Sequence, residues 1–468
     1  MLPPFPPEII SLILHYLLLP APSPSPSRSP SHSCSPPFIH RRTEFQTDFL
    51  FSLNSLNDAP NWAKPAGDRL WKDLHVGVRM EANSIILALK QDQNRLGGAK
   101  RGTAGKVKVL HLEIRQYQRE VAWGPPGSSP PSSPILTMPR EEPEQPDGVT
   151  PSQIRQLAEL LPNLSTICIR SSVTGSWFFD QDIHEALKSF VSRKGFKHIE
   201  FDSHFIGISN ILSLTSHAPH LETLKLQSLK HTSNSPDYER IVSGGTHVNL
   251  FASLRNLTLS RCYLNDEQFE LIFLTLTSRP STITSLTLHE LLAPSKESDH
   301  FPNPFWYTPR ATQTISRIIP YLESFHLVLA PHSIPLDAAT FAPWFSGSKL
   351  KKITLGGDNL SFHDNFFPTL LKLNKFRPVS IRLFPTSTTG GLDFVKLGKI
   401  LQDVWADELV LLDLEHAVES KESRLSVEGA CERGNGVSGG KRFLEERVER
   451  VNRVRRQEEG KRELILRI

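Results

Sequence analysis

The sequence predicts an α/β fold, in which parallel strands with outer helices stack as a solenoid behind a small all-α N-terminal module. Three observations lead to this prediction. A short apolar pattern recurs between residues 109 and 412, helix-start signals lie between its copies, and the surplus of the 37 prolines is concentrated in two tracts. Strand followed by helix, repeated along a chain, is typical of stacked units in which neighbours bury one another's apolar faces.

The recurring pattern is that of a leucine-rich repeat, L-x-x-L-x-L-x-x-N/C-x-L. Residues 254–264 fit it at every specified position, with Cys262 in the turn slot, and residues 350–360 fit it with Asp358 in that slot. Partial copies centre on Ile167, Ile199, Leu224, Leu286 and Phe325, and weaker strands lie near 109–112, 379–383 and 409–412. We therefore expect a leucine-rich-repeat domain over 151–416, with a first strand at 106–117.

Helix-start signals separate these strands. Thr150, Pro151 and Gln153 supply a capping residue, a proline in the first turn and a glutamine three residues after the cap. Residues 265–268 repeat this signature, and 180–191 has a similar apolar face. Helices are therefore predicted after the strands, on the outside of the stack.

Composition marks the segments that cannot form a core. Residues 20–37 hold seven prolines and seven serines, and 124–151 hold nine prolines, so we expect a disordered insertion at 19–43 and a linker at 118–150. Residues 441–468 carry ten Lys/Arg and six Asp/Glu, a net charge of +4 that equals the whole-chain total. Residues 417–468 are predicted to be a charged tail, either a solvated or frayed helix or a site for an acidic partner.

The N-terminal apolar run from Ile9 to Leu19 predicts an amphipathic helix. No Lys or Arg precedes it, Glu8 lies directly before it and His15 interrupts it, which argues against a secretion signal. Pro6 and Glu8 suit a first helical turn, and Ile9, Ile13 and Leu17 fall on one face.

The stretch Phe5-Pro6-Pro7-Glu8-Ile9, continued by Ile13, Leu14 and Leu17, resembles the opening helix of the F-box. After the Ser/Pro tract the similarity resumes at 45–56, then at Trp62 and at 69–76, which contains Trp71 and resembles the end of fungal F-box-like proteins. The resemblance covers 2 to about 78. We therefore predict an F-box-like module at 1–78, and its alternative is a helical cap on the repeats.

An F-box followed by leucine-rich repeats resembles the F-box/leucine-rich-repeat class of substrate adaptors. This resemblance implies docking to a Skp-family linker protein within a cullin-RING ubiquitin ligase, in the cytoplasm or nucleus. It implies linker contacts by six residues: Pro6, Glu8, Ile9, Ile13, Leu17 and Trp71. The competing interpretations are a repeat scaffold without a ligase connection and, less favoured for lack of cysteine-rich caps, a secreted or surface receptor.

Strand alternation predicts which side chains face outward from the strands. They are polar and of mixed charge, which suits recognition of a protein, although a merely solvated face has the same composition. The predicted substrate-binding residues are Lys225, Gln227, Asn256, Thr258, Ser260, Thr287, His289 and Lys352.

The sequence carries no pattern of an enzyme. It has no G-x-S-x-G elbow, H-E-x-x-H helix or EF-hand loop, and its 18 histidines form no ligand cluster. Cys34, Cys168, Cys262 and Cys431 form no C-x-x-C pair, which indicates a reducing compartment and excludes a zinc site built from such pairs. We expect no catalytic residues, metal or cofactor, no nucleic-acid or membrane partner, and a packing role for Cys262.

Overall fold

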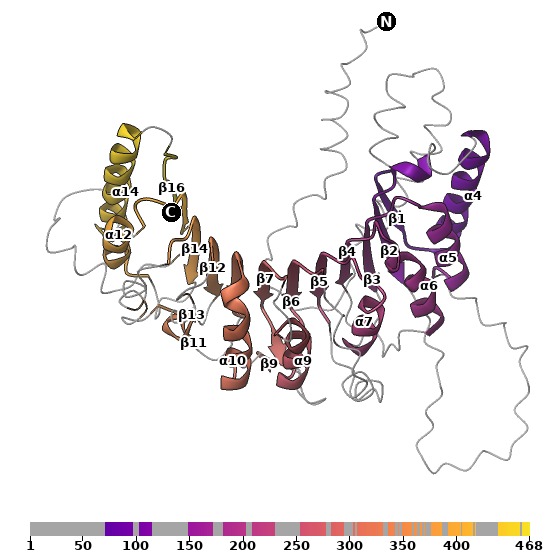
Figure 1. The fold of residues 1–468 in the computed structure, drawn as a ribbon, viewed down its shortest axis with the longest axis horizontal. Coiled ribbons are helices and arrows are strands. Elements are labelled where there is room, and N and C mark those ends of the chain that lie inside the picture. Colours follow the sequence, from indigo (N-terminus) through magenta and orange to yellow (C-terminus); the bar gives the residue numbers. More distant parts are fainter. Residues whose placement is uncertain are drawn as a thin grey trace, which may run out of the picture. The chain divides into compact units, whose positions relative to one another are not determined.

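A computed structural model describes the residues that form the repeated strands and helices (Figure 1). They are 71–96, 103–114, 148–171, 181–202, 208–229, 253–277, 282–293, 303–304, 307–330, 336–341, 345, 349–357, 360–362, 366, 369, 376–385, 392–403, 405–414, 417, 439–458 and 461–468. They belong to two compact units, Met1–Phe205 and Ile206–Ile468, which we call unit 1 and unit 2. Each unit is described by itself.

Unit 1 alternates strands and helices. Its elements are β1 (Asp73–Val76), α4 (Arg79–Leu96), the 3-10 helix η1 (Thr103–Lys106), β2 (Val109–Ile114), α5 (Pro151–Leu160), β3 (Thr166–Ser171), α6 (Gln181–Val191) and β4 (His198–Asp202). The four strands are parallel and lie in chain order. Across them, Leu74 lies beside Leu110, Leu110 beside Ile167, and Ile167 beside Ile199. This order is the one expected for consecutive strand–helix repeats.

The helices of unit 1 pack in sequence, α4 on α5 and α5 on α6. The predicted start of α5 is confirmed. The Thr150 side chain accepts the Gln153 backbone N–H, while the Gln153 side chain accepts the Thr150 N–H, a complete capping box. The Gln153 amide also donates to Arg79 O and Asn83 Oδ1 of α4, so one residue both starts α5 and fixes it to its neighbour.

Unit 2 continues the alternation with longer insertions. Its helices are α7 (Ile208–Thr215), α9 (Asp266–Thr277), α10 (Pro309–Ile318), η3 (Ile319–Tyr321), η4 (Ala338–Thr340), α12 (Phe394–Asp403) and α14 (Gly439–Gln457). Its sheet contains β5 (Thr223–Gln227), β6 (Asn256–Ser260), β7 (Ser285–His289), β10 (Ser324–Val328), β12 (Lys352–Gly357), β14 (Ser380–Pro385), β15 (Leu411–Asp413) and β16 (Ile465–Arg467), in that order and all parallel. Two small pairs, β8 (Leu292–Ala293) with β9 (Asn303–Pro304) and β11 (Leu336–Asp337) with β13 (Leu360–Ser361), lie in the connections.

The core of unit 2 is built from the repeating apolar positions. Leu224, Leu257, Leu286, Phe325 and Ile353 lie beside one another on successive strands and are all buried. The predicted packing role of Cys262 is confirmed. Its side chain is buried, and its thiol lies 3.3 Å from Leu226 O of the preceding repeat.

A tight backbone turn follows several strands of unit 2. Ser228, Arg261 and Glu290, each one residue past its strand, have φ of 59°, 51° and 49°. Each of these residues donates its backbone N–H to the next strand, at Ser260 O, His289 O and Val328 O respectively. At the end of β12, Gly357 has φ 113° and lies against the Leu329 backbone. The turn therefore repeats as a structural unit, like the strands themselves.

The segment predicted as a charged tail is part of unit 2. In α14, Leu444, Val448 and Val451 are buried, and the helix packs against α12. Arg455, 3% exposed, donates Nε to Ala406 O and Nη1 to Arg462 O, while β16 pairs with β15. The prediction of a separate tail over 417–468 is therefore wrong for α14 and β16, because one apolar stripe is enough to dock an otherwise charged helix.

The strands also begin earlier than predicted. The strand expected to be the first, at 106–117, is β2, and β1 at Asp73–Val76 precedes it and pairs with it. Residues 73–76, assigned to the end of the F-box-like module, therefore belong to the sheet of unit 1. The α/β class with parallel strands and outer helices is confirmed (Figure 1).

Residues 1–70 of the all-α module predicted at 1–78, and most of the proline-rich linker predicted at 118–150, lie outside the described residues. Within the described part of the chain, no helix combines the length and apolar character needed to cross a membrane.

Candidate binding face

The candidate site is the exposed face of the strands in unit 2. On β5, β6 and β7 every second residue is buried, and the residues between them are at least partly exposed. This period of two is the property of a strand with one side on the core. The face consists of the side chains between the buried leucines.

The parallel register sorts this face into three rows that run across the strands. Neighbouring members of a row belong to strands about 4.8 Å apart. The first row is Thr223, Asn256, Ser285, Ser324, Lys352 and Ser380; the second is Lys225, Thr258, Thr287, His326, Thr354 and Arg382; the third begins with Gln227, Ser260 and His289.

All eight predicted substrate-binding residues lie in these rows. Seven of them are on the three adjacent strands β5, β6 and β7, so positions 62 residues apart in the chain, Lys225 and Thr287, lie two strands apart. Lys352 lies two strands beyond β7, in the same row as Asn256. The structure thus gathers the predicted residues into one continuous polar surface.

His326 and Arg382 belong to this surface but were not among the predicted residues. Each lies between two buried strand residues, Phe325 and Leu327 or Ile381 and Leu383, and the same period of two identifies both. The His326 ring stacks with the His289 ring, with centroids 6.1 Å apart and planes 19° apart. The centre of the face therefore carries two imidazoles from adjacent strands.

Charges on and beside the face occur in pairs from neighbouring strands. Arg261 Nε lies 2.7 Å from Glu290 Oε2, and Arg382 Nε lies 3.4 Å from Asp413 Oδ2. At the beginning of the strands, Lys351 Nζ lies 3.4 Å from Glu323 Oε2. These partners are about 30 residues apart in sequence, and the register of the repeats brings them together.

The imidazoles are held in the neutral form. Burial is the main cause that lowers the pKa of His326 to about 4, and His289 and Arg382 add to the shift. Burial also lowers the pKa of His289, with Glu290 opposing and Arg261 supporting the shift. At neutral pH the centre of the face therefore offers uncharged rings that donate and accept hydrogen bonds.

This shift predicts a pH dependence of stability. The unfolded chain protonates His326 near pH 6.5, whereas the folded chain does so only near pH 4. Stability is therefore lost as the pH falls from 6.5 towards 4. The contribution of His326 between pH 7 and pH 5 is about 2 kcal/mol.

Urea unfolding of the wild type and of His326→Gln at both pH values measures this contribution. We expect the pH-dependent loss to be smaller by about that amount in the variant. An equal loss in both proteins would show that His326 does not carry the effect.

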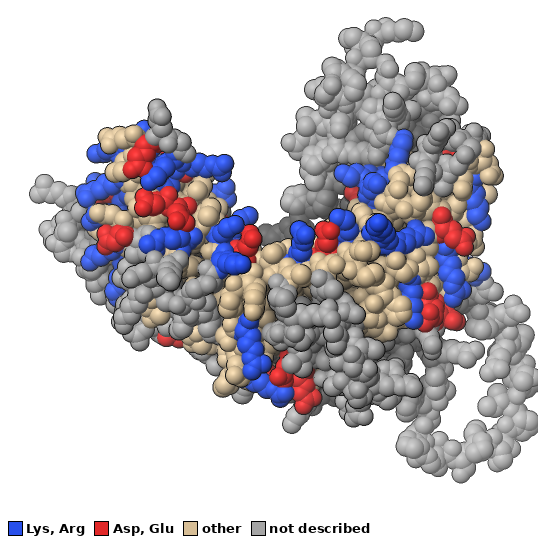
Figure 2. All heavy atoms as spheres, in the orientation of Figure 1, with Lys and Arg blue, Asp and Glu red and all other residues tan. Residues whose placement is uncertain are grey.

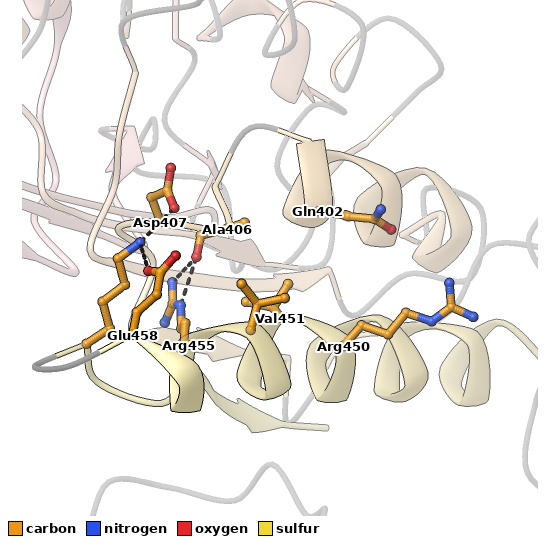
Figure 3. Close-up of a pocket in the computed structure, with 9 residues that line it drawn as sticks. Gln402, Ala406, Asp407, Arg450, Val451, Arg455 and Glu458 are labelled. Atoms are coloured by element: carbon orange, nitrogen blue, oxygen red, sulfur yellow. Dashed lines mark hydrogen bonds and ion pairs between the residues drawn. The ribbon is translucent and has the colours of Figure 1, made fainter.

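A pocket lies between α12 and α14 (Figure 3). The pocket has a volume of about 270 Å³ and is lined by Gln402, Ala406, Asp407, Arg450, Val451, Val454, Arg455, Glu458 and Lys461. Several of its polar groups bind each other. Arg455 donates to Ala406 O, and Lys461 Nζ lies 3.1 Å from Asp407 Oδ1. These contacts hold α14 and the residues that follow it against the loop after α12 in unit 2.

The described residues contain no group of three or more His, Cys, Asp or Glu side chains placed to hold a metal ion. Of the six predicted linker-protein contacts, Pro6, Glu8, Ile9, Ile13 and Leu17 lie outside the described residues, and Trp71, just before β1, is partly exposed.

No protein-family model and no curated protein matches the chain. Among solved structures, the yeast complex of Rad7 and Elc1 is similar over 79% of this chain and 92% of that chain, at 12% identity and a TM-score of 0.31. A structure from Bacteroides fragilis is similar over 47% of this chain and 65% of that chain, at 16% identity and a TM-score of 0.24. At these TM-scores neither likeness assigns a function or partner to this chain.

Proposed function

We propose that the chain is a non-enzymatic substrate-recognition adaptor of an SCF-type cullin-RING E3 ubiquitin ligase, acting in the cytoplasm or nucleus. In this proposal the strand face of unit 2 binds a protein substrate. The N-terminal segment, through Pro6, Glu8, Ile9, Ile13, Leu17 and Trp71, binds a Skp-family linker protein. The adaptor then raises the effective concentration of the substrate at the ligase and orients it, with no bond made or broken by its own residues.

The observation that supports substrate binding is the polar strand face of unit 2. Parallel strands hold hydroxyl, amide, imidazole and amino groups in three fixed rows, on a backbone that is hydrogen-bonded on both sides. Such a surface presents many donors and acceptors at low ordering cost, which suits a folded protein or an extended peptide. We assign substrate contacts to Lys225, Gln227, Asn256, Thr258, Ser260, Thr287, His289 and Lys352.

The ligase half is supported by the F-box-like sequence over 2–78, and changing its apolar stripe tests it. In the full chain, Ile9→Asp together with Ile13→Asp places two carboxylates on the face predicted to contact the linker protein. We expect co-purification with the Skp-family protein to be abolished, while the circular dichroism spectrum is unchanged.

Ser11→Asp is the matched control, because residue 11 lies off the stripe of Ile9, Ile13 and Leu17. It adds a carboxylate to the same predicted helix and should leave binding intact. Retained binding in the Ile9/Ile13 double variant contradicts the linker interface. A wild-type chain that does not bind the Skp-family protein at all favours the repeat scaffold without a ligase connection.

A further inference from the structure

Unit 1 carries a concentration of lysines where its strands begin. Lys72, Lys108 and Lys197 each directly precede a strand, β1, β2 and β4 respectively. The backbone N–H groups of Lys108 and Val109 donate to Lys72 O, and those of Lys197 and His198 donate to Ser165 O. These hydrogen bonds hold the three lysines in one column, which runs across the strands at the ends where the strands begin.

Two further lysines extend this column. Lys106 ends η1, just before β2, and Lys194 lies in the turn between α6 and β4. The turn is fixed to the preceding repeat because Arg193, next to Lys194, donates Nη1 to Leu161 O at 2.8 Å. All five lysines, Lys72, Lys106, Lys108, Lys194 and Lys197, are exposed, and we call them the lysine edge.

The segments that build the lysine edge supply little negative charge of their own. The segments that build it, 71–73, 103–109, 161–166 and 192–198, contain one carboxylate, Asp73. Within the described residues, Lys72, Lys108 and Lys194 form no ion pair, whereas elsewhere in unit 1 Arg170 pairs with Asp202 and Lys188 with Glu185. Figure 2 shows Lys and Arg side chains together with Asp and Glu side chains on the surface of this unit. The like charges of Lys72, Lys108 and Lys194 add their fields towards an approaching anion.

We propose that the lysine edge docks an acidic segment of a partner protein. The column from β1 to β4 spans three strand spacings, about 14 Å, which is the length of four to five residues of extended peptide. The edge offers little for base stacking in a nucleic-acid complex, because Phe196 is buried and Trp71 is only partly exposed. Two polar side chains beside the lysines already have partners, because the amide of Asn163 and the hydroxyl of Ser165 donate to backbone carbonyls of the unit itself. These donors are therefore engaged within the protein. The proposal is independent of the ligase role and of the unit 2 face.

The test uses the full chain and a fluorescein-labelled peptide with five consecutive glutamates between Gly-Ser flanks. Fluorescence anisotropy in 50 mM NaCl should show binding that weakens as salt is added, because exposed charges are screened. Lys72→Glu combined with Lys108→Glu should weaken binding about tenfold or more, and Lys194→Glu alone about twofold to threefold. A peptide with five glutamines should not bind.

The matched control reverses two exposed lysines elsewhere, Lys349→Glu with Lys399→Glu, which changes the net charge by the same amount. It should leave binding within about twofold, and Lys72→Arg with Lys108→Arg should retain binding because the charge is kept. An equal loss in the control, or no binding by the wild type, overturns the proposal. Tighter binding of a labelled 20-base-pair DNA duplex that the Lys72/Lys108 variant loses also overturns it, in favour of a nucleic-acid site.

Discussion

Leu444→Asp is expected to separate the C-terminal elements of unit 2 from the rest of that unit. Leu444 is completely buried on the side of α14 that packs against α12. A carboxylate there must either stay charged without a partner in an apolar contact or take up a proton. Together with the loss of apolar contacts, this lowers the free energy of unfolding by about 4 kcal/mol, which is a large share of the stability of an ordinary domain.

Val454→Asp is the matched control because it introduces the same side chain into the same helix at a position that is 56% exposed. It should change the free energy of unfolding by less than about 0.5 kcal/mol. Urea unfolding and limited proteolysis of the full-length variants measure the difference. If both variants unfold like the wild type, α14 does not contribute to the core of unit 2.

Among the glycines in the strands of unit 2, Gly357 is the one at which replacement by alanine is expected to destabilise the protein most. Gly357 has φ 113°, a value that residues with a side chain rarely adopt. An added Cβ would lie 2.5 Å from Leu329 O and 2.7 Å from Leu329 N, which are backbone atoms of the neighbouring repeat. Backbone strain and overpacking together cost about 3 kcal/mol or more.

Gly195→Ala provides the comparison, because a Cβ at Gly195 would meet no atom within 4 Å. That variant should unfold within about 0.5 kcal/mol of the wild type, while Gly357→Ala lowers the midpoint of thermal and urea unfolding clearly. Equal midpoints for the two variants would mean that the backbone at Gly357 adapts to a side chain.

The sequence predicted the repeats well where local pattern and tertiary packing agree. Residues 254–264 match the repeat template throughout, and the structure places β6 there with Cys262 buried behind it. β1 was assigned to the wrong element. Four alternating residues, Asp73 to Val76, are too few to specify a strand by themselves, and pairing with β2 decides their conformation. The packing of α14 was not predicted because ten of its nineteen residues are charged. Only its contact with α12 shows that its apolar stripe is buried.

The candidate face was predicted as a set of side chains but not as a network. The period of two identifies Thr258 and His289 as outward-facing from sequence alone. The stacking of His289 on His326 and the pair Arg261–Glu290 depend on which repeats are neighbours and on their register. Because the insertions between repeats vary in length, sequence spacing does not give that register.

The order of the strands also bears on how the chain is made. In each unit the strands are stacked in the order in which they occur in the sequence, and each pairs with the one that precedes it in the sheet. During synthesis, every new strand–helix unit therefore emerges after the surface that it must cover. The protein can fold from its N-terminal side as it leaves the ribosome, one repeat at a time, without waiting for distant segments.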